Sequence, residues 1–504
     1  MKQKNYLITT CLVIAVLFAV YSIHIDYPLP FHSEEQDHLI LAKEIALGNK
    51  INAGSNWEIG FTVLLAVINS LLLNNLNQIY IFVPIIFGLI LAFSSFLLGR
   101  YLFKSSLAGL FFGLFSLMIP SNPAVMGLWF VVPNALALAL TPFLIYLFLK
   151  GTINKKWAFL FIIFFAFTTI IHPAFTMLLI PLITLYLLFN PKLFERNQMK
   201  IAIAIIILII LFPFFASRIG LQEITLTHET FTFISKNITK VLVWESITQY
   251  NPKFYLTEFI GLYTIILAGI GTGLIILMRL LIEIKRRQKQ KSILEKDFTV
   301  SRHQIIIPIA VIVLGFLYFH FHLKDYTFIA PYERMYLILM LFLLLSAASG
   351  VFLIWKLLSK KIQFDSMKFL SIAFIAITVF FLLTIPFTQK NELYKNIEVT
   401  GVSTIKWIED FTPKKSSFIA LPKNSLTIRF FTERKIFASP PTRAGIPDDF
   451  ELEKFFIENC TKRNEVLEQT KAEYILGEKE ISCSSFEKIY DKKEYKIYKV
   501  INVK

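Results

Sequence analysis

The chain contains few cysteines, three in 504 residues. So small a set excludes the disulfide framework that holds together small secreted domains. Cys11 lies inside the first apolar run, where a cysteine packs as a small hydrophobic side chain. Cys460 and Cys483 lie in the polar C-terminal part, and they can pair if that part is extracytoplasmic.

Charge is scarce inside the long apolar runs. Only 17% of the residues are charged, whereas 55% are hydrophobic, 51 are phenylalanine, and the mean hydropathy is +0.61. The apolar runs are roughly 17–22 residues long, which is the length that crosses the core of a bilayer. A soluble domain of this size could not bury so much apolar surface. The composition therefore predicts a polytopic α-helical membrane protein.

Acidic residues are fewer than basic ones, and the net charge is +16. The Lys and Arg residues stand mostly in short loops between apolar runs, the distribution that sets membrane topology. This distribution argues against a nucleic-acid partner. The N-terminal apolar run is longer than the roughly 7–15 residues of a signal-peptide core, and no A-x-A cleavage motif follows it, so we expect an uncleaved first helix.

The positive-inside rule decides whether the apolar run 57–73 crosses the membrane. If it lies in the interface, the cytoplasmic loops hold 22 Lys and Arg residues and the outer loops hold 8. If it crosses, the very basic segment 279–302 moves to the outside. Trp57, Glu58 and Asn69 also suit an interfacial helix. We expect an N-terminus in the cytoplasm and eleven spans: 6–25, 78–99, 105–119, 125–149, 157–171, 174–189, 200–215, 258–278, 303–320, 335–355 and 368–386.

The composition changes sharply after Pro386. Residues 387–504 are charged and contain short alternating stretches such as AEYILG and YKIYKV, which predict a small soluble α/β domain. With eleven spans before it, this domain lies on the extracytoplasmic side of the plasma membrane. We therefore expect a transmembrane domain over 1–386, with a first outer loop over 26–77, and a second domain over 387–504.

The first outer loop opens with an unusual acidic cluster, HSEEQDH at 32–38. A helix is predicted from Glu34 onward, because Leu39, Ala42 and Ile45 keep a 3.6-residue period. One reading is that the acids only cap and solvate a surface helix. The other is chemical, because Glu34, Asp37 and His38 share one helix face at the membrane boundary. An acid there can deprotonate a hydroxyl group or bind a divalent cation.

Other predicted outer segments supply complementary groups. Arginine can hold a phosphate with two parallel hydrogen bonds, which makes Arg218 and Arg334 candidate phosphate ligands, with Glu333 beside the latter. His172 precedes a proline and can either end a helix or bind substrate. The pair His320 and His322 could join Asp325 in a metal site if the segment is a strand or a turn.

These features resemble the GT-C superfamily of membrane glycosyltransferases, which includes protein mannosyltransferases, aminoarabinose transferases and oligosaccharyltransferases. The family carries an acidic pair at the start of its first outer loop, followed by residues at helical spacing. Looser similarity covers His172-Pro173, the stretch 332–350 and the C-terminal part. The residues that match the first-loop motif are Glu34, Glu35, His38, Ala42, Ile45 and Gly48.

The resemblance implies a reaction on the outer face of the membrane. A sugar passes from a polyprenyl-phosphate donor to a protein, lipid or glycan acceptor, usually with inversion. The leading acid is then the base or a ligand for Mg2+ or Mn2+, the only cofactor implied. The family usually has Asp where this chain has Glu34, so Glu35 or Asp37 can take that part instead. His38 and His172 would orient donor or acceptor, and Arg334 with Arg218 would neutralise the lipid phosphate.

Two other functions remain open from the sequence. A flippase or transporter of lipid-linked sugars or polysaccharide usually shows internal repeats and polar residues near the membrane midplane. This chain shows no repeated halves, and its polar groups gather at the outer boundary, which favours chemistry at the interface. A non-catalytic assembly factor of the same fold is the third reading, because Glu34 replaces the usual Asp.

Overall fold

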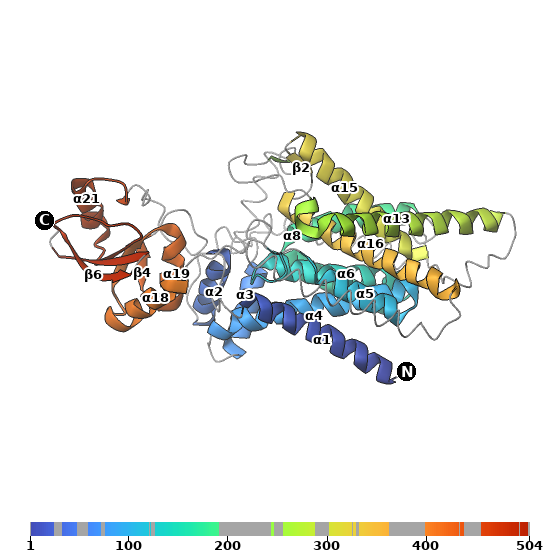
Figure 1. Cartoon of the computed structure of the whole chain (residues 1–504), viewed down its shortest axis with the longest axis horizontal. Helices are drawn as coiled ribbons and strands as arrows, with labels where there is room; N and C mark the ends of the chain where they lie inside the picture. Colours follow the sequence, from blue (N-terminus) through green and yellow to red (C-terminus); the bar gives the residue numbers. More distant parts are fainter. Residues whose placement is uncertain are drawn as a thin grey trace, which may run out of the picture. The chain divides into compact units, whose positions relative to one another are not determined.

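The computed structural model describes fifteen segments of the chain, which fall into two compact units (Figure 1). The first unit comprises Met1–Asp26, Trp57–Gly60 and Ile81–Leu393, and the second comprises Tyr27–Asn56, Phe61–Tyr80 and Tyr394–Lys504. The second unit therefore combines most of the predicted first outer loop with the C-terminal part of the chain. The described residues are 2–24, 33–47, 59–71, 76–119, 121, 127–190, 243–245, 256–287, 302–324, 326–328, 332–361, 399–432, 434–437, 455–492 and 494–501.

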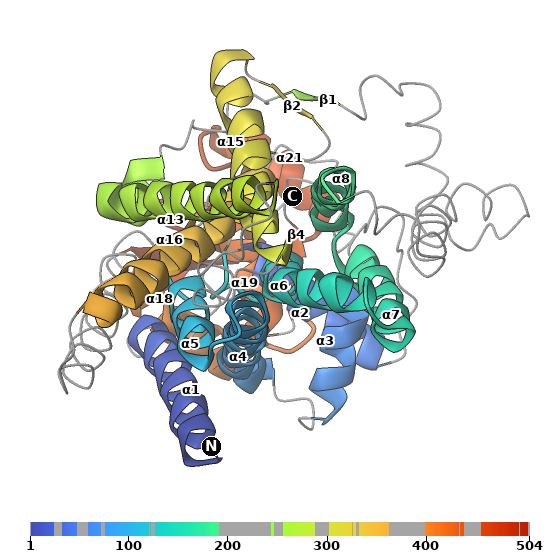
Figure 2. The same ribbon diagram turned by 90° about the vertical axis from the view of Figure 1, so that its right-hand side faces the viewer.

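The first unit is built from apolar helices (Figure 2). Among the described residues, five helices are long and apolar enough to cross a membrane: α4 (Leu76–Phe103), α6 (Pro133–Gly151), α13 (Leu256–Arg287), α15 (Ile306–Lys324, preceded by the 3-10 turn Arg302–Ile305) and α16 (Tyr332–Lys361). The other helices of this unit are α1 (Lys2–His24), α5 (Ser106–Ser116), α7 (Lys155–Ile171) and α8 (Pro173–Leu188). The predicted spans 200–215 and 368–386 lie outside the described residues.

Helices α13 and α16 lie side by side, as both ribbon views show (Figures 1 and 2). Their backbones approach so closely that a Cβ atom added at Gly271 would lie 2.0 Å from the carbonyl oxygen of Ser346. The Ser346 hydroxyl donates to the carbonyl oxygen of Ala268 at 2.8 Å and lies 2.8 Å from the Thr272 hydroxyl. Small side chains and hydroxyl groups hold helices together in this way where lipid replaces water.

Among the described apolar helices, α3 (Ile59–Leu71) and α5 fall furthest short of the length that crosses a bilayer. Helix α3 has 13 residues and α5 has 11. At 1.5 Å per residue these helices reach about 20 and 16 Å. The hydrocarbon core is about 30 Å thick. The length of α3 fits an interfacial position for 57–73, whereas α5 covers only part of the predicted span 105–119.

The C-terminal part of the chain forms a five-stranded mixed sheet in the order β4-β3-β5-β7-β6. Strand β3 (Ser417–Ala420) is parallel to β4 (Lys435–Phe437) and β5 (Tyr474–Gly477), and β7 (Tyr495–Val500) is antiparallel to β5 and β6 (Phe486–Lys492). The helices α18 (Val399–Phe411), α19 (Pro422–Thr432) and α21 (Cys460–Thr470) accompany the sheet. The predicted α/β character of this part is confirmed.

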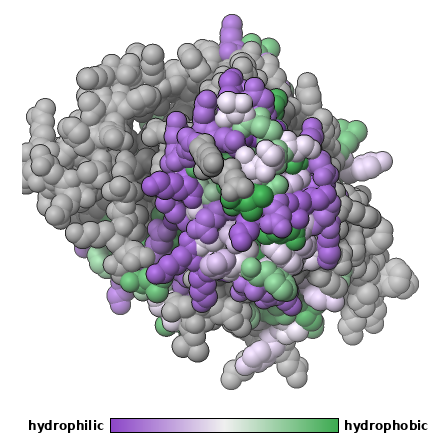
Figure 3. All heavy atoms as spheres, turned by 90° about the vertical axis from the view of Figure 1, so that its left-hand side faces the viewer, coloured by the Kyte–Doolittle hydropathy of each residue, from purple (hydrophilic) through white to green (hydrophobic). Residues whose placement is uncertain are grey.

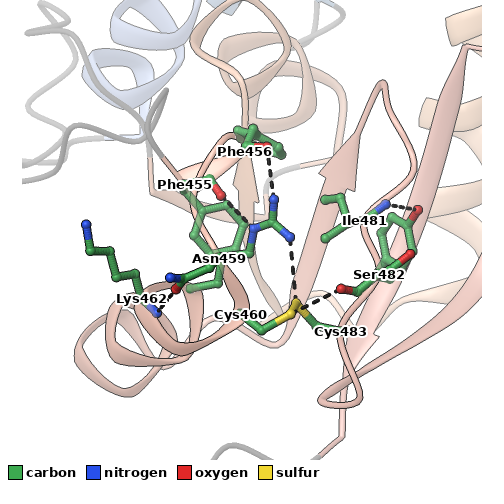
Figure 4. Close-up of a disulfide and its surroundings, with 10 residues drawn as sticks. Phe455, Phe456, Asn459, Cys460, Lys462, Ile481, Ser482 and Cys483 are labelled. Carbon is green, nitrogen blue, oxygen red and sulfur yellow. Dashed lines mark hydrogen bonds between the residues drawn. A yellow bond between two sulfur atoms is a disulfide. The ribbon is translucent and has the colours of Figure 1, made fainter.

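The core of this sheet domain is apolar, and the face seen in Figure 3 carries many hydrophilic side chains with hydrophobic patches between them. A disulfide joins Cys460 to Cys483 with a Cα–Cα distance of 5.7 Å (Figure 4), a pairing that the sequence left open. The disulfide joins α21 to the loop before β6.

The buried residues that form the apolar core of the sheet domain are Ile419, Phe455, Leu467, Ala472, Ile475, Ile481, Phe486 and Tyr498.

Candidate active site

The acidic cluster lies on helix α2 (Ser33–Ala46), which begins where the sequence predicts a helix. Glu35 and Asp37 are only 1% and 7% exposed, His38 is fully buried, and Glu34 is partly exposed. A helix whose acids only face solvent would leave these carboxyl groups in water. The burial therefore contradicts the reading in which all the acids merely solvate a surface helix.

Burying carboxylates is unfavourable unless the surroundings compensate for lost hydration. One compensation comes from α2 itself, because Glu34 and Glu35 lie in its first turn. The partial positive charge of a helix N-terminus favours negative groups there.

Helix α3 fixes the imidazole of His38. Its Nδ1 atom lies 3.1 Å from the hydroxyl oxygen of Thr62. The ring of Phe61 packs edge-on against the imidazole, with 5.2 Å between ring centroids and 88° between planes. A hydrogen bond and a perpendicular ring leave the imidazole one orientation. Thr62 and Phe61 were not predicted from the sequence as site residues.

Helix α19 of the same unit holds α2 through polar contacts that sequence reasoning missed. The Gln36 amide donates to the Thr427 hydroxyl at 3.0 Å, and that hydroxyl approaches the Gln36 carbonyl oxygen at 3.1 Å. Further along α2, Glu44 accepts a charged hydrogen bond from Arg429 at 2.5 Å. The helix that carries the candidate carboxylates is therefore anchored to the sheet domain as well as to α3.

His172 lies in the first unit, at the turn where α7 ends and α8 begins. Its backbone is extended, with φ −156° and ψ 96°, and Pro173 takes the first position of α8. The imidazole is buried, and it packs edge-on against Phe175 with 5.1 Å between ring centroids. The prediction that His172 ends a helix is confirmed, and a substrate role stays a prediction.

Glu333 and Arg334 lie in the first turn of α16 and are partly exposed. A helix N-terminus favours Glu333 and disfavours the positive charge of Arg334. The guanidinium therefore gains no stabilisation from the dipole of its own helix. The hydroxyl oxygen of the preceding residue, Tyr332, lies 3.1 Å from the Nε2 atom of His322.

The predicted histidine metal pair is wrong in its geometry. His320 and His322 belong to helix α15, not to a strand or a turn. Residues two apart on a helix point about 200° away from each other, so the two rings cannot share an ion. Asp325, the proposed third ligand, and Arg218 lie outside the described residues. Within the described segments, no group of three His, Cys, Asp or Glu side chains could hold a metal ion.

No family model matches the chain, and no curated protein matches it either. Solved structures do match. ArnT from Cupriavidus metallidurans bound to undecaprenyl phosphate has a TM-score of 0.62 and 10% identity, covering 99% of this chain and 98% of that one. The oligosaccharyltransferase AglB from Archaeoglobus fulgidus, in complex with an inhibitory peptide and a dolichol-phosphate, has a TM-score of 0.54 and 13% identity, covering 94% and 69%.

The same archaeal enzyme, tethered to an acceptor peptide containing the NVT sequon, has a TM-score of 0.55 and 13% identity over 94% of this chain and 69% of that one. At these identities the likeness concerns the fold. It extends over nearly the whole chain in each comparison, and the described helices include five that could cross a membrane. The chain is a membrane protein with the fold of the GT-C glycosyltransferases, the group to which both neighbours belong.

Proposed function

We propose that this protein is a glycosyltransferase that moves a sugar from a polyprenyl-phosphate donor to an acceptor on the outer face of the plasma membrane. The GT-C fold supports the reaction class. One structural neighbour holds undecaprenyl phosphate, and the other holds a dolichol-phosphate with a peptide. A lipid-phosphate donor is therefore the natural choice for this chain, with a protein, lipid or glycan as acceptor.

The observation that carries the proposal is the burial of the α2 carboxylates beside a fixed imidazole. Glu35 and Asp37 are nearly inaccessible to water, and His38 is held by Thr62 and Phe61. A catalytic group gains most from its environment when it is positioned before the substrate arrives. Helix α2 meets that condition, because contacts on α3 and α19 anchor it.

In the proposed reaction, Glu34, with Glu35 or Asp37, removes the proton from an acceptor hydroxyl group. The hydroxyl oxygen then forms a bond to the anomeric carbon of the sugar. The bond between that carbon and the phosphate oxygen breaks, and the electron pair leaves with the lipid phosphate. Proton transfer to a positioned carboxylate typically contributes about 10²–10⁴-fold in rate.

The departing lipid phosphate needs fixed positive charge. We assign this task to Arg334, with Arg218, since a guanidinium can form two parallel hydrogen bonds to a phosphate. Glu333 would bind substrate beside Arg334, and His38 and His172 would orient donor or acceptor. No group of three acidic or histidine side chains in the described segments could hold an ion by itself, so Mg2+ or Mn2+ enters the proposal only as a cation that an α2 carboxylate would bind together with the donor phosphate, with no reaction step assigned to it.

The proposal is tested with purified protein in liposomes and a radiolabelled polyprenyl-phosphate sugar. Transfer of label to an added peptide, lipid or oligosaccharide acceptor is the expected result. Movement of the intact labelled lipid between leaflets without transfer would instead identify a flippase. If the label is neither transferred nor moved between leaflets, the interpretation as a non-catalytic assembly factor is the one that stands.

A further inference from the structure

Three aromatic rings of the second unit form a stack that ends in solvent. Tyr490 of β6 packs against Trp407 of α18, with 5.0 Å between centroids and 40° between planes. Trp407 stacks in turn on Phe411, the last residue of α18, at 5.4 Å and 24°. Phe411 is 68% exposed, whereas the other two rings are partly buried.

The stack presents Phe411 as a supported ring rather than a loose one. Trp407 and Phe411 are four residues apart, so they lie on one face of α18, and the tryptophan ring lies beneath the phenylalanine. A large exposed apolar ring in water is unfavourable and usually marks a contact surface. A ring that is held out in this way can receive a ligand without first losing conformational freedom.

Polar groups surround this ring stack. The hydroxyl groups of Tyr490 and Thr404 lie 3.2 Å apart, and Lys492 donates to the Ser403 hydroxyl at 3.5 Å. Tyr490 and Lys492 are two residues apart on β6, so both face α18. On α18 itself, Lys406, Glu409 and Asp410 are exposed. The surface therefore combines one flat apolar ring with donors, acceptors and both signs of charge.

This pattern matches the chemistry of a pyranose sugar. One face of a pyranose ring carries C–H groups that are slightly positive, and the electron-rich face of an aromatic ring attracts them. The edge of the same sugar carries hydroxyl groups that need both donors and acceptors. Lys406 and Asp410 of α18 are exposed and charged, and a purely apolar partner, such as an acyl chain, would remove water from these charges without replacing its hydrogen bonds.

We propose that Phe411, supported by Trp407 and Tyr490, binds a pyranose residue of the acceptor, so that the acceptor is itself a glycan. The identification of this glycan as the acceptor rests on the proposed glycosyltransferase function. The binding of the sugar does not. The surface binds the acceptor away from the reacting bond, so it raises local acceptor concentration without taking part in the chemistry.

The test uses the purified full-length chain, immobilised through a terminal tag, and three neutral probes: maltohexaose, mannohexaose and chitohexaose. At least one probe is expected to bind. Phe411→Ala weakens that binding at least tenfold, and Phe411→Tyr, which keeps the ring, retains it within about threefold. The matched control is Ile457→Ala, because Ile457 is also exposed, at 84%, in the same unit and takes no part in the stack.

The proposal is overturned if no hexasaccharide binds, or if Phe411→Ala binds as well as the unchanged chain. It is also overturned if Phe411→Ala leaves saccharide binding intact and instead weakens contact of the domain with vesicles of phosphatidylcholine and phosphatidylglycerol. The binding assay contains no lipid-linked donor and records no transfer. Its failure is therefore separate from a failure of the proposed glycosyltransferase reaction.

Discussion

Gln36 and Thr427 are 391 residues apart in the chain, and their side chains contact each other through two polar distances of 3.0 and 3.1 Å. Gln36 lies between the two buried acids of α2, and Thr427 lies on α19 beside the sheet. Both side chains are buried, so neither could replace this contact by a hydrogen bond to water. This contact couples the position of the candidate carboxylates to the folding of the C-terminal domain.

Thr427→Val keeps the side-chain shape and removes the hydroxyl group, so the buried Gln36 amide loses its partner. We expect a loss of about 1–3 kcal/mol of stability, seen as a lower melting temperature, and slower sugar transfer. The control is Thr470→Val, because that buried hydroxyl donates to the Val466 carbonyl of its own helix. Equal effects of the two substitutions on transfer would show that Thr427 has no special role.

Replacing each candidate base by its amide separates the three acids of α2. Glu34→Gln, Glu35→Gln and Asp37→Asn keep shape and remove charge, and the true base loses about 10²–10⁴-fold in kcat. Its loss also removes the fall in rate at low pH that protonation of the base causes. The control is Glu465→Gln, an exposed acid on α21 of the same unit. Full activity in all three variants would refute the assignment.

Arg334 is expected to act through its guanidinium geometry as well as its charge. Arg334→Gln removes both and lowers kcat/KM by about 10²–10³-fold, as losses of transition-state donors do. Arg334→Lys keeps the charge but cannot bind phosphate with two parallel hydrogen bonds. Its kcat/KM is therefore expected to lie between those of the unchanged protein and Arg334→Gln. Lys356→Gln, on the same helix, is the control. Steady-state kinetics with a lipid-phosphate sugar measure the series, and equal activity of all variants speaks against a phosphate role.

Because α13 and α16 lie so close together, we expect alanine to destabilise the protein at Gly271 but not at Gly269. Gly271→Ala forces a methyl group against the Ser346 backbone, whereas the added Cβ at Gly269 meets nothing within 4 Å. Overpacking costs about 1–3 kcal/mol or more, and here backbone rather than a flexible side chain must move. We expect a lower melting temperature and yield for Gly271→Ala alone. Similar melting of both variants would contradict the packing.

Local patterns in the sequence were sufficient for part of this structure. The start of α2 and the helix end at His172 follow from hydrophobic period and proline position. Each depends on residues close in sequence, whereas the Cys460–Cys483 bond was left open because it depends on the compartment of the C-terminal part. The helix over 303–320 was predicted, but its continuation through His322 was not, because the spacing of the two histidines alone does not tell a strand or turn from a helix.

Long-range contacts could not be predicted. Nothing near Thr427 or Arg429 signals that they meet Gln36 and Glu44, since tertiary folding alone brings the two segments together. The burial of Asp37 was hidden for the same reason, because an acid in a helical first turn is equally typical of an exposed cap. The candidate acids could therefore be identified from the sequence, but the residues of α19 that contact their helix could not.

Sidedness is the claim on which the proposed reaction depends, and cysteine labelling on intact cells measures it. In a Cys11→Ala background, single cysteines replace Leu47 and Ile457, which are exposed on the second unit, and Lys289 in the basic segment. A membrane-impermeant maleimide should label Leu47→Cys and Ile457→Cys at once, and Lys289→Cys only after the cells are opened. Labelling of Lys289→Cys on intact cells, with the other two protected, would place the acids in the cytoplasm and contradict the account.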